Sequence, residues 1–310
     1  MKILVSFCLA ACSLYGQAGK LGAPSLGFAF DQSAHALRRI QGIPGASLVG
    51  APVEFGMAVS AAYVSPRLDS AFVLSDDGRM HLFGLTTDAP AERTIDLTGS
   101  PQRVVFSPSG SAAALYSAGS LQVIKGLPDA PVVAANIRLR INPRLGRALP
   151  ETLAVSDDGA YLLYSTGGPI EMIGVAGDSR QVMAGGGAGS LAAFAPGGHD
   201  AAIVDSEKLI LFQNIAGAAT ERRFPGIATP SAVAFSADSQ KLFVASATGR
   251  AVASIQVASG DRAALACDCA PAALIPMGSV IRLTELGNEP LWLLDTAFDR
   301  VVFVPAPVTN

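Results

Sequence analysis

The chain is poor in the residues on which many active sites depend. Of its 310 residues, 3 are histidine, 4 are cysteine and 1 is tryptophan. No His-x-His pair, His-Glu-x-x-His sequence or EF-hand loop occurs, so the short motifs of zinc and calcium sites are missing. The glycines at 185–187 and 189 lack the Gly-Lys-Ser/Thr ending of a phosphate loop, and no Gly-x-Ser-x-Gly elbow is present. We therefore expect no cofactor and no bound metal.

Charge is also scarce, because Asp, Glu, Lys and Arg make up only 15% of the chain. Basic residues number 22 and acidic residues 25, a formal net charge of −3, which argues against a general nucleic-acid partner. No apolar run approaches the roughly 20 residues that a transmembrane helix needs. We expect neither nucleic-acid binding nor a membrane-spanning segment.

The most informative feature is a repeated unit, seen clearly in VAFSADSQKLFVASATGRAVASIQV at 233–257. An apolar run ends, a polar turn follows, and a second apolar run begins five residues after the first has ended. The period of about 40–50 residues is typical of propeller blades built from four short strands. The first runs of the six copies end at Ser65, Ser107, Ser156, Ala195, Ser236 and Glu285.

The turns of the unit are rich in Gly, Asp and Ser, which supply a positive φ or a side-chain bond to the backbone. Short apolar runs bounded by such turns predict an all-β meander. No segment shows a helical period with a cap at both ends, and strands do not alternate with helices, so parallel α/β folds are excluded. The acidic pairs Asp76-Asp77 and Asp157-Asp158 each precede a glycine, and we interpret them as turn formers.

The corners Phe-Ser-Pro-Ser-Gly at 106–110 and Val-Ser-Asp-Asp-Gly at 155–159 carry a family resemblance. Over residues 25–308 the chain resembles the WD40-like and YVTN-type secreted β-propellers of bacteria. The Gly-His and Trp-Asp signatures of true WD40 blades are absent, and the only tryptophan is Trp292. The resemblance implies a single β-propeller and leaves the activity open, since one fold hosts many functions.

Six first runs predict six blades. Two strands near the N-terminus, 26–30 and 37–40, match the last two strands of a unit. They are predicted to join the C-terminal blade and close the ring, which hides its edges. Together, however, the two ends carry one strand too many for a four-stranded blade. The alternative is therefore seven blades, with residues 19–60 forming a blade of their own.

Residues 1–18 have the composition of a secretory signal: Lys2 precedes a short apolar stretch, and Gly16-Gln-Ala18 fits a cleavage site. We predict that the propeller domain covers residues 19–310 and lies outside the cytoplasm, secreted or periplasmic. The alternative is a lipoprotein, because Leu9-Ala-Ala-Cys12 resembles a lipobox that would place lipid on Cys12.

Four arginines in the longest link between units are the candidate ligand-binding residues: Arg138, Arg140, Arg144 and Arg147. Arg138 and Arg140 share one face of a predicted strand, and the guanidinium fork suits an anionic ligand or a carboxylate-rich partner. The alternative is a solvated outer strand and loop.

Cys267 and Cys269 are the only thiol pair after the signal segment, and we predict a disulfide between them. A bridge across one residue needs a turn, because extended residues i and i+2 lie near the outer limit for a disulfide. The alternatives are that the two cysteines are free thiols, or that they bind a metal or act as a redox-active pair. We interpret the isolated His35, His81 and His199 as ordinary surface or structural residues.

With a clear scaffold and no catalytic constellation, the sequence favours a monomeric, non-enzymatic binding propeller. A protein or carbohydrate ligand would bind at one mouth of the central channel. The alternative is an enzyme resembling the lactonase-like or quinoprotein-like propellers, which would need several Asp, Asn, Glu or His side chains to converge there. A third reading is a cell-envelope scaffold held by lipid at Cys12.

Overall fold

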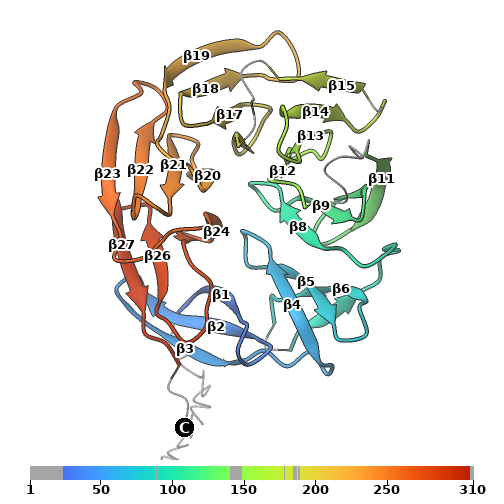
Figure 1. Ribbon diagram of the computed structural model, residues 1–310. Coiled ribbons are helices and arrows are strands. Elements are labelled where there is room, and N and C mark those ends of the chain that lie inside the picture. Colours follow the sequence, from blue (N-terminus) through green and yellow to red (C-terminus); the bar gives the residue numbers. More distant parts are fainter. Residues whose placement is uncertain are drawn as a thin grey trace, which may run out of the picture.

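The computed structural model describes residues 24–87, 89–139, 149–177, 179–183, 187 and 189–307. Their secondary structure consists of short antiparallel strands and turns, arranged as seven sheets in a ring (Figure 1). The predicted all-β propeller is confirmed. Over the part of the chain that is described, no helix is long and apolar enough to span a bilayer.

The seven sheets follow one another in chain order. Blade 1 contains β1 (Ser25–Asp31), β2 (Ala36–Ile43) and β3 (Ala46–Pro52); blade 2 contains β4 (Val59–Val64), β5 (Ser70–Ser75), β6 (Met80–Gly84) and β7 (Ala91–Arg93); blade 3 contains β8 (Arg103–Phe106), β9 (Ala112–Ser117), β10 (Ser120–Lys125) and β11 (Val132–Arg138). Blade 4 contains β12 (Thr152–Val155), β13 (Tyr161–Ser165), β14 (Glu171–Gly174) and β15 (Ser179–Val182); blade 5 contains β16 (Leu191–Phe194), β17 (Ala201–Val204), β18 (Lys208–Gln213) and β19 (Thr220–Pro225). Blade 6 contains β20 (Ala232–Phe235), β21 (Lys241–Ser246), β22 (Ala251–Gln256) and β23 (Arg262–Ala266); blade 7 contains β24 (Ile275–Met277), β25 (Val280–Arg282), β26 (Leu291–Asp295) and β27 (Arg300–Val304).

The five-residue spacing of the repeat corresponds in the structure to a hydrogen-bonded turn between the first two strands of a blade. In five of the six copies the amide of the residue that follows the inner strand donates to the carbonyl five residues later. In three of these turns the serine hydroxyl also accepts the reciprocal amide: from Ala112 to Ser107 (3.1 Å), from Tyr161 to Ser156 (3.0 Å) and from Lys241 to Ser236 (2.9 Å). The pairs are Ser65–Ser70 (2.9 Å), Ser107–Ala112 (2.8 Å), Ser156–Tyr161 (3.0 Å), Ala195–Asp200 (2.8 Å) and Ser236–Lys241 (2.9 Å). These buried serines satisfy the turn internally, which explains why the same residue recurs.

The first strand of each four-stranded blade is the inner one. Neighbouring inner strands contact one another, as β12 does β8 and β16, and β16 does β20. In Figure 1, β8, β12, β20 and β24 lie nearest the centre of the ring. Each hydrophobic cluster of the core combines side chains from two adjacent blades, for example Leu121 of blade 3 with Leu162 of blade 4. The core therefore lies between the sheets.

The prediction of six blades is wrong, and so is the predicted closure. The sixth repeat anchor, Glu285, does not end an inner strand, because it follows β25, the second strand of blade 7. The true inner strand, β24, has only three residues, Ile-Pro-Met, and carries no repeat signature. Blade 7 is thus complete without help, and the N-terminal strands form a separate sheet, as in the seven-blade alternative.

Blade 1 has three strands and, in the described part of the chain, no inner one. Asp31 forms a parallel bridge with Leu286, which follows β25, so β1 runs in the direction of a second strand. Its other end lies against the last residue of β24, because a Cβ on Gly27 would stand 2.2 Å from Met277 Cγ. Since no inner strand of blade 1 intervenes, the amide of Gly278 in blade 7 donates directly to Pro66 of blade 2 (2.9 Å).

Candidate functional site

Four polar side chains of blades 2, 3 and 7 are linked in pairs, one pair by a hydrogen bond and the others through their charges. Tyr63 lies on β4, Arg103 begins β8, Arg282 ends β25, and Glu285 follows it. Arg282 Nη2 donates to Glu285 Oε1 at 3.0 Å, and Arg103 Nη1 donates to the carbonyl of Pro150. The charges of both Arg103 and Glu285 act on the Tyr63 phenol. We call Tyr63, Arg103, Arg282 and Glu285 the axial cluster.

Burial dominates the electrostatics of the axial cluster. Burial raises the pKa of the Tyr63 phenol; the Arg103 charge opposes this rise, and Glu285 adds to it. Burial also lowers the pKa of Arg103 and of Arg282, opposed by Tyr63 and by Glu285 respectively. Arginine nevertheless keeps its charge in proteins. The cluster therefore holds the half-buried cation of Arg103, the almost fully buried cation of Arg282, one carboxylate and a neutral phenol.

One polar atom of the cluster is left over. The Arg282 side chain is only 11% exposed, and its Nε is buried without a hydrogen-bond partner among the residues described. Buried donors in native proteins are nearly always paired, so an orphan of this kind needs an explanation. Glu285, 48% exposed, leaves the cluster in contact with solvent.

Several partly exposed positions of the inner strands are alanine, namely Ala61, Ala62, Ala154, Ala193 and Ala232, and all of these but Ala61 pack against the cores between blades. Within the described ranges, no group of three or more His, Cys, Asp or Glu side chains lies close enough together to hold a metal ion. Against this background the axial cluster stands out as a concentration of buried charge.

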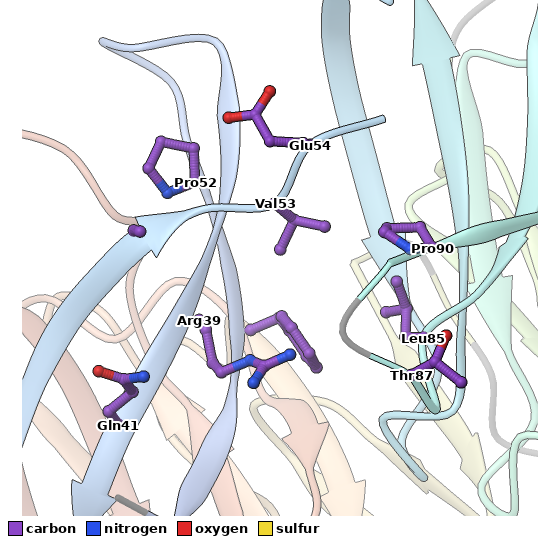
Figure 2. Close-up of a pocket in the computed structure, with 10 residues that line it drawn as sticks. Arg39, Gln41, Pro52, Val53, Glu54, Leu85, Thr87 and Pro90 are labelled. Atoms are coloured by element: carbon purple, nitrogen blue, oxygen red, sulfur yellow. The ribbon is translucent and has the colours of Figure 1, made fainter. Parts of the chain in front are cut away.

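A second candidate is a groove between blades 1 and 2. Figure 2 shows Arg39 and Gln41 on one wall, with Leu85, Thr87 and Pro90 opposite. Its volume is about 230 Å³, and an adjoining hollow of about 250 Å³ shares several of its side chains. The groove forms where the short β7 leaves the face of blade 1 uncovered.

The groove and the axial cluster lie in different places, and we assign function to the cluster. The groove is smaller than the roughly 300–1,000 Å³ of most small-ligand pockets. Of its two buried apolar side chains, Phe28 and Leu85, Phe28 is already covered by the Arg39 guanidinium at 5.5 Å. The cluster instead combines charge, burial and an unsatisfied donor, which are the marks of a site built for a polar ligand.

The predicted arginine patch lies elsewhere. Arg138 ends β11, the outermost strand of blade 3, and is exposed, with its carbonyl accepting a bond from Arg180 Nη2 at 2.8 Å. Arg140, Arg144 and Arg147 lie outside the described residues, as does Cys12. Ligand binding by this patch stays a prediction.

The structure joins Cys267 and Cys269 in a disulfide, with the Cα atoms 5.0 Å apart. Both side chains are buried and pack with Leu274 and Ile281 in the core between blades 6 and 7. The bridge thus lies in the link from β23 to β24, where it shapes the connection to the closing blade.

The histidines take part in separate local contacts. His81 on β6 pairs with Glu92 (2.7 Å), and His199 in a turn pairs with Asp158 (2.9 Å). His35 occupies a turn with a φ of 48°. None of the three belongs to the axial cluster.

The sequence reading missed the axial cluster because its members are far apart in the chain, from Tyr63 to Glu285. One local sign was present. Arg282 interrupts the apolar run Val280–Leu283, and a charge inside a strand of that kind needs a partner when buried. Nothing local, however, indicated that Tyr63 and Arg103 would lie beside it.

Comparisons with known proteins support the fold alone. No family model matches the chain, and a search of curated proteins finds no match. A functionally unknown protein from Desulfotomaculum acetoxidans DSM 771 is similar in structure, with a TM-score of 0.58, 11% identity, and coverage of 91% of this chain and 99% of that one. Apo AztD from Citrobacter koseri has a TM-score of 0.57 and 12% identity, with coverage of 92% of this chain and 95% of that one. Kuenenia stuttgartiensis hydrazine synthase has a TM-score of 0.51 and 14% identity, with coverage of 95% of this chain and 100% of that one. At such low identities the likeness extends to the β-propeller fold and no further.

Proposed function

We propose that the protein is an extracytoplasmic, non-enzymatic binding scaffold that holds its ligand at the axial cluster. The observation that carries this proposal is the almost fully buried guanidinium group of Arg282, whose Nε has no partner among the described residues. Burying charge is costly unless it is compensated; Glu285 compensates Arg282, while the half-buried Arg103 bonds to the carbonyl of Pro150. A ligand would supply the missing partner of Arg282 Nε.

The shape of the ring supports a binding role. Its inner surface is assembled from strands that are tied into blades, so a ligand would meet a site with little freedom to move. Preorganised sites bind more tightly because less conformational freedom is lost on association. The extracytoplasmic location is proposed from residues 1–18, with a lipid on Cys12 as the alternative.

A thermal-shift screen of the full chain would test this function. The screen would use small organic acids, neutral oligosaccharides and short peptides, against the wild type and Arg103→Ala. We expect members of at least one class to raise the wild-type melting temperature, because ligands that bind the folded state stabilise it. The rise should disappear in Arg103→Ala.

Two further variants make the screen decisive. Arg223→Ala is the control, since Arg223 is exposed on the outer strand β19 and should leave the ligand response unchanged. Arg138→Ala tests the outer patch. A response that vanishes in Arg138→Ala and survives in Arg103→Ala would move the site to that patch, and no response from any class would reject the proposal.

A further inference from the structure

The groove between blades 1 and 2 has a size that suits a single side chain. Its two adjoining hollows measure about 230 and 250 Å³, and they share Phe28, Arg39, Leu85 and Thr87. Each hollow is smaller than the pockets that enclose most small ligands. The groove therefore suits one side chain of a partner protein better than a whole small molecule.

One wall of the groove presents a guanidinium group that lies over an aromatic ring. The Arg39 side chain reaches from β2 toward the opposite wall, where Leu85 and Thr87 lie (Figure 2). Its guanidinium carbon stands 5.5 Å from the centre of the buried Phe28 ring. Because Arg39 lines both hollows, the same group also borders the open space. A planar cation in this position attracts the face of a second aromatic ring.

The surface beside the groove is apolar as well. Val53 and Pro90 belong to its lining. Leu48 lies directly opposite Gln41 in the pairing of β2 with β3, so both side chains are on the same face of blade 1. Leu48 is 66% exposed. Exposed apolar surface that continues a pocket is a mark of protein interaction sites, in which an aromatic anchor fills the pocket and weaker contacts surround it.

We propose that the groove is a docking site for a segment of a partner protein, which inserts one aromatic side chain between Arg39 and Leu85. Stacking uses the face of the guanidinium and leaves the N–H groups of Arg39 to their own bonds. A neighbouring apolar residue of the same segment would cover Leu48. This site is separate from the axial cluster, so the two proposals are tested independently.

NMR titration of the isotope-labelled full chain with three blocked pentapeptides would test this inference. Each peptide carries leucine at both ends and alanine between, and its central residue is phenylalanine, cyclohexylalanine or alanine. Cyclohexylalanine has nearly the size of phenylalanine but no π system. We expect the phenylalanine peptide to bind about fivefold more tightly than the cyclohexylalanine peptide. The alanine peptide should bind most weakly, because nothing fills the groove.

Two variants and a control locate the site. Arg39→Met keeps the apolar stem of the side chain and removes the guanidinium plane, so it should abolish the preference for phenylalanine over cyclohexylalanine. Leu48→Ser should weaken the binding of both peptides several-fold. Because Leu48 is exposed, this variant keeps the test decisive even where Arg39→Met fails to fold. Arg223→Ala is the unaffected control.

Several results would overturn the inference. The first is equal binding of the phenylalanine and cyclohexylalanine peptides, or no binding of either. The second is a preference for phenylalanine that survives in Arg39→Met. The third is full binding by Leu48→Ser, or binding of p-cresol as tight as that of the phenylalanine peptide, because either would make the groove a site for a free aromatic compound.

Discussion

Blade 4 and blade 1 meet their neighbours in different ways. In blade 4 the turn carboxylate of Asp157 reaches both sides, accepting the amide of Ser109 in blade 3 and of Gly197 in blade 5, each at 2.7 Å. Blade 1 has no described inner strand and so no such turn; its buried carboxylate, Asp31, ends β1 and is used within its own blade by Ser33, Ala34 and Arg38.

The difference shows how a repeat becomes a closed ring. At the joints on either side of blade 4, the Asp157 carboxylate connects the turns of three consecutive blades. The closing joint has no inner strand to offer such a turn, so it relies on β1, stiffened by Asp31, and on the bridge from Asp31 to Leu286. Arg282 and Glu285 belong to blade 7 and Tyr63 to blade 2, the two blades on either side of this incomplete one.

The largest effect is expected from Asp31→Ala, which removes the carboxylate at the closing joint. The side chain is 2% exposed, and its loss leaves Arg38 and two amides without their acceptor. Breaking a buried pair of this kind should lower the free energy of unfolding by about 3 kcal/mol. Urea denaturation followed by circular dichroism would measure it.

The pH dependence of the same group has a defined sign. Burial raises the pKa of Asp31, but bonds from Ser33, Ala34 and Arg38 outweigh this, and the net pKa is lowered. Its stabilisation is therefore present above the ordinary carboxyl pKa of about 3.9 and is lost as the pH falls through the lowered value. Asp77, in an exposed turn, is the control. Equal destabilisation by Asp77→Ala would contradict a special role for the closing joint.

A smaller effect is expected from Asp157→Ala, which removes two bonds between blades. Because Asp157 is only partly buried, the loss should be about 2 kcal/mol. The matched control is Asp238→Ala in blade 6, whose carboxylate bonds only within its own turn, to Ser236 and Gln240. Denaturant midpoints should separate the two variants, and identical values would show that the shared carboxylate adds nothing.

The sequence pattern was sufficient to predict the regular joints between blades, but it was not sufficient to predict the joint that closes the ring. The spacing from Ser107 to Ala112 and from Ser156 to Tyr161 is local, since one turn satisfies its own backbone groups. The three residues of β24 have no such turn at a repeat position, and strand direction in blade 1 depends on Leu286, which lies far along the chain. The repeat pattern therefore predicts that the chain forms propeller blades more reliably than it predicts how many blades there are.

The candidate site was harder to predict for the same reason. Arg138 and Arg140 attracted attention because they are close together in sequence, yet Arg138 lies on an outer strand. Tyr63, Arg103 and Arg282 come from three blades, and only ring closure brings them together. Side chains near a propeller axis are neighbours in space because each blade contributes an inner strand there. A motif within one stretch of sequence cannot reveal such neighbours.

The smallest effect is expected at the joint between blade 6 and the closing blade 7, from the double change Cys267→Ser and Cys269→Ser. The disulfide closes a loop of three residues, and so short a loop restricts the unfolded chain little. The loop-entropy relation gives about 1.5 kcal/mol, half of the loss expected for Asp31→Ala. Denaturation of the variant, with thiol titration of the unfolded wild type to establish that the bridge is present, would measure it. A loss larger than that of Asp31→Ala would mean that the ring is held closed by the link between β23 and β24, not by the first blade.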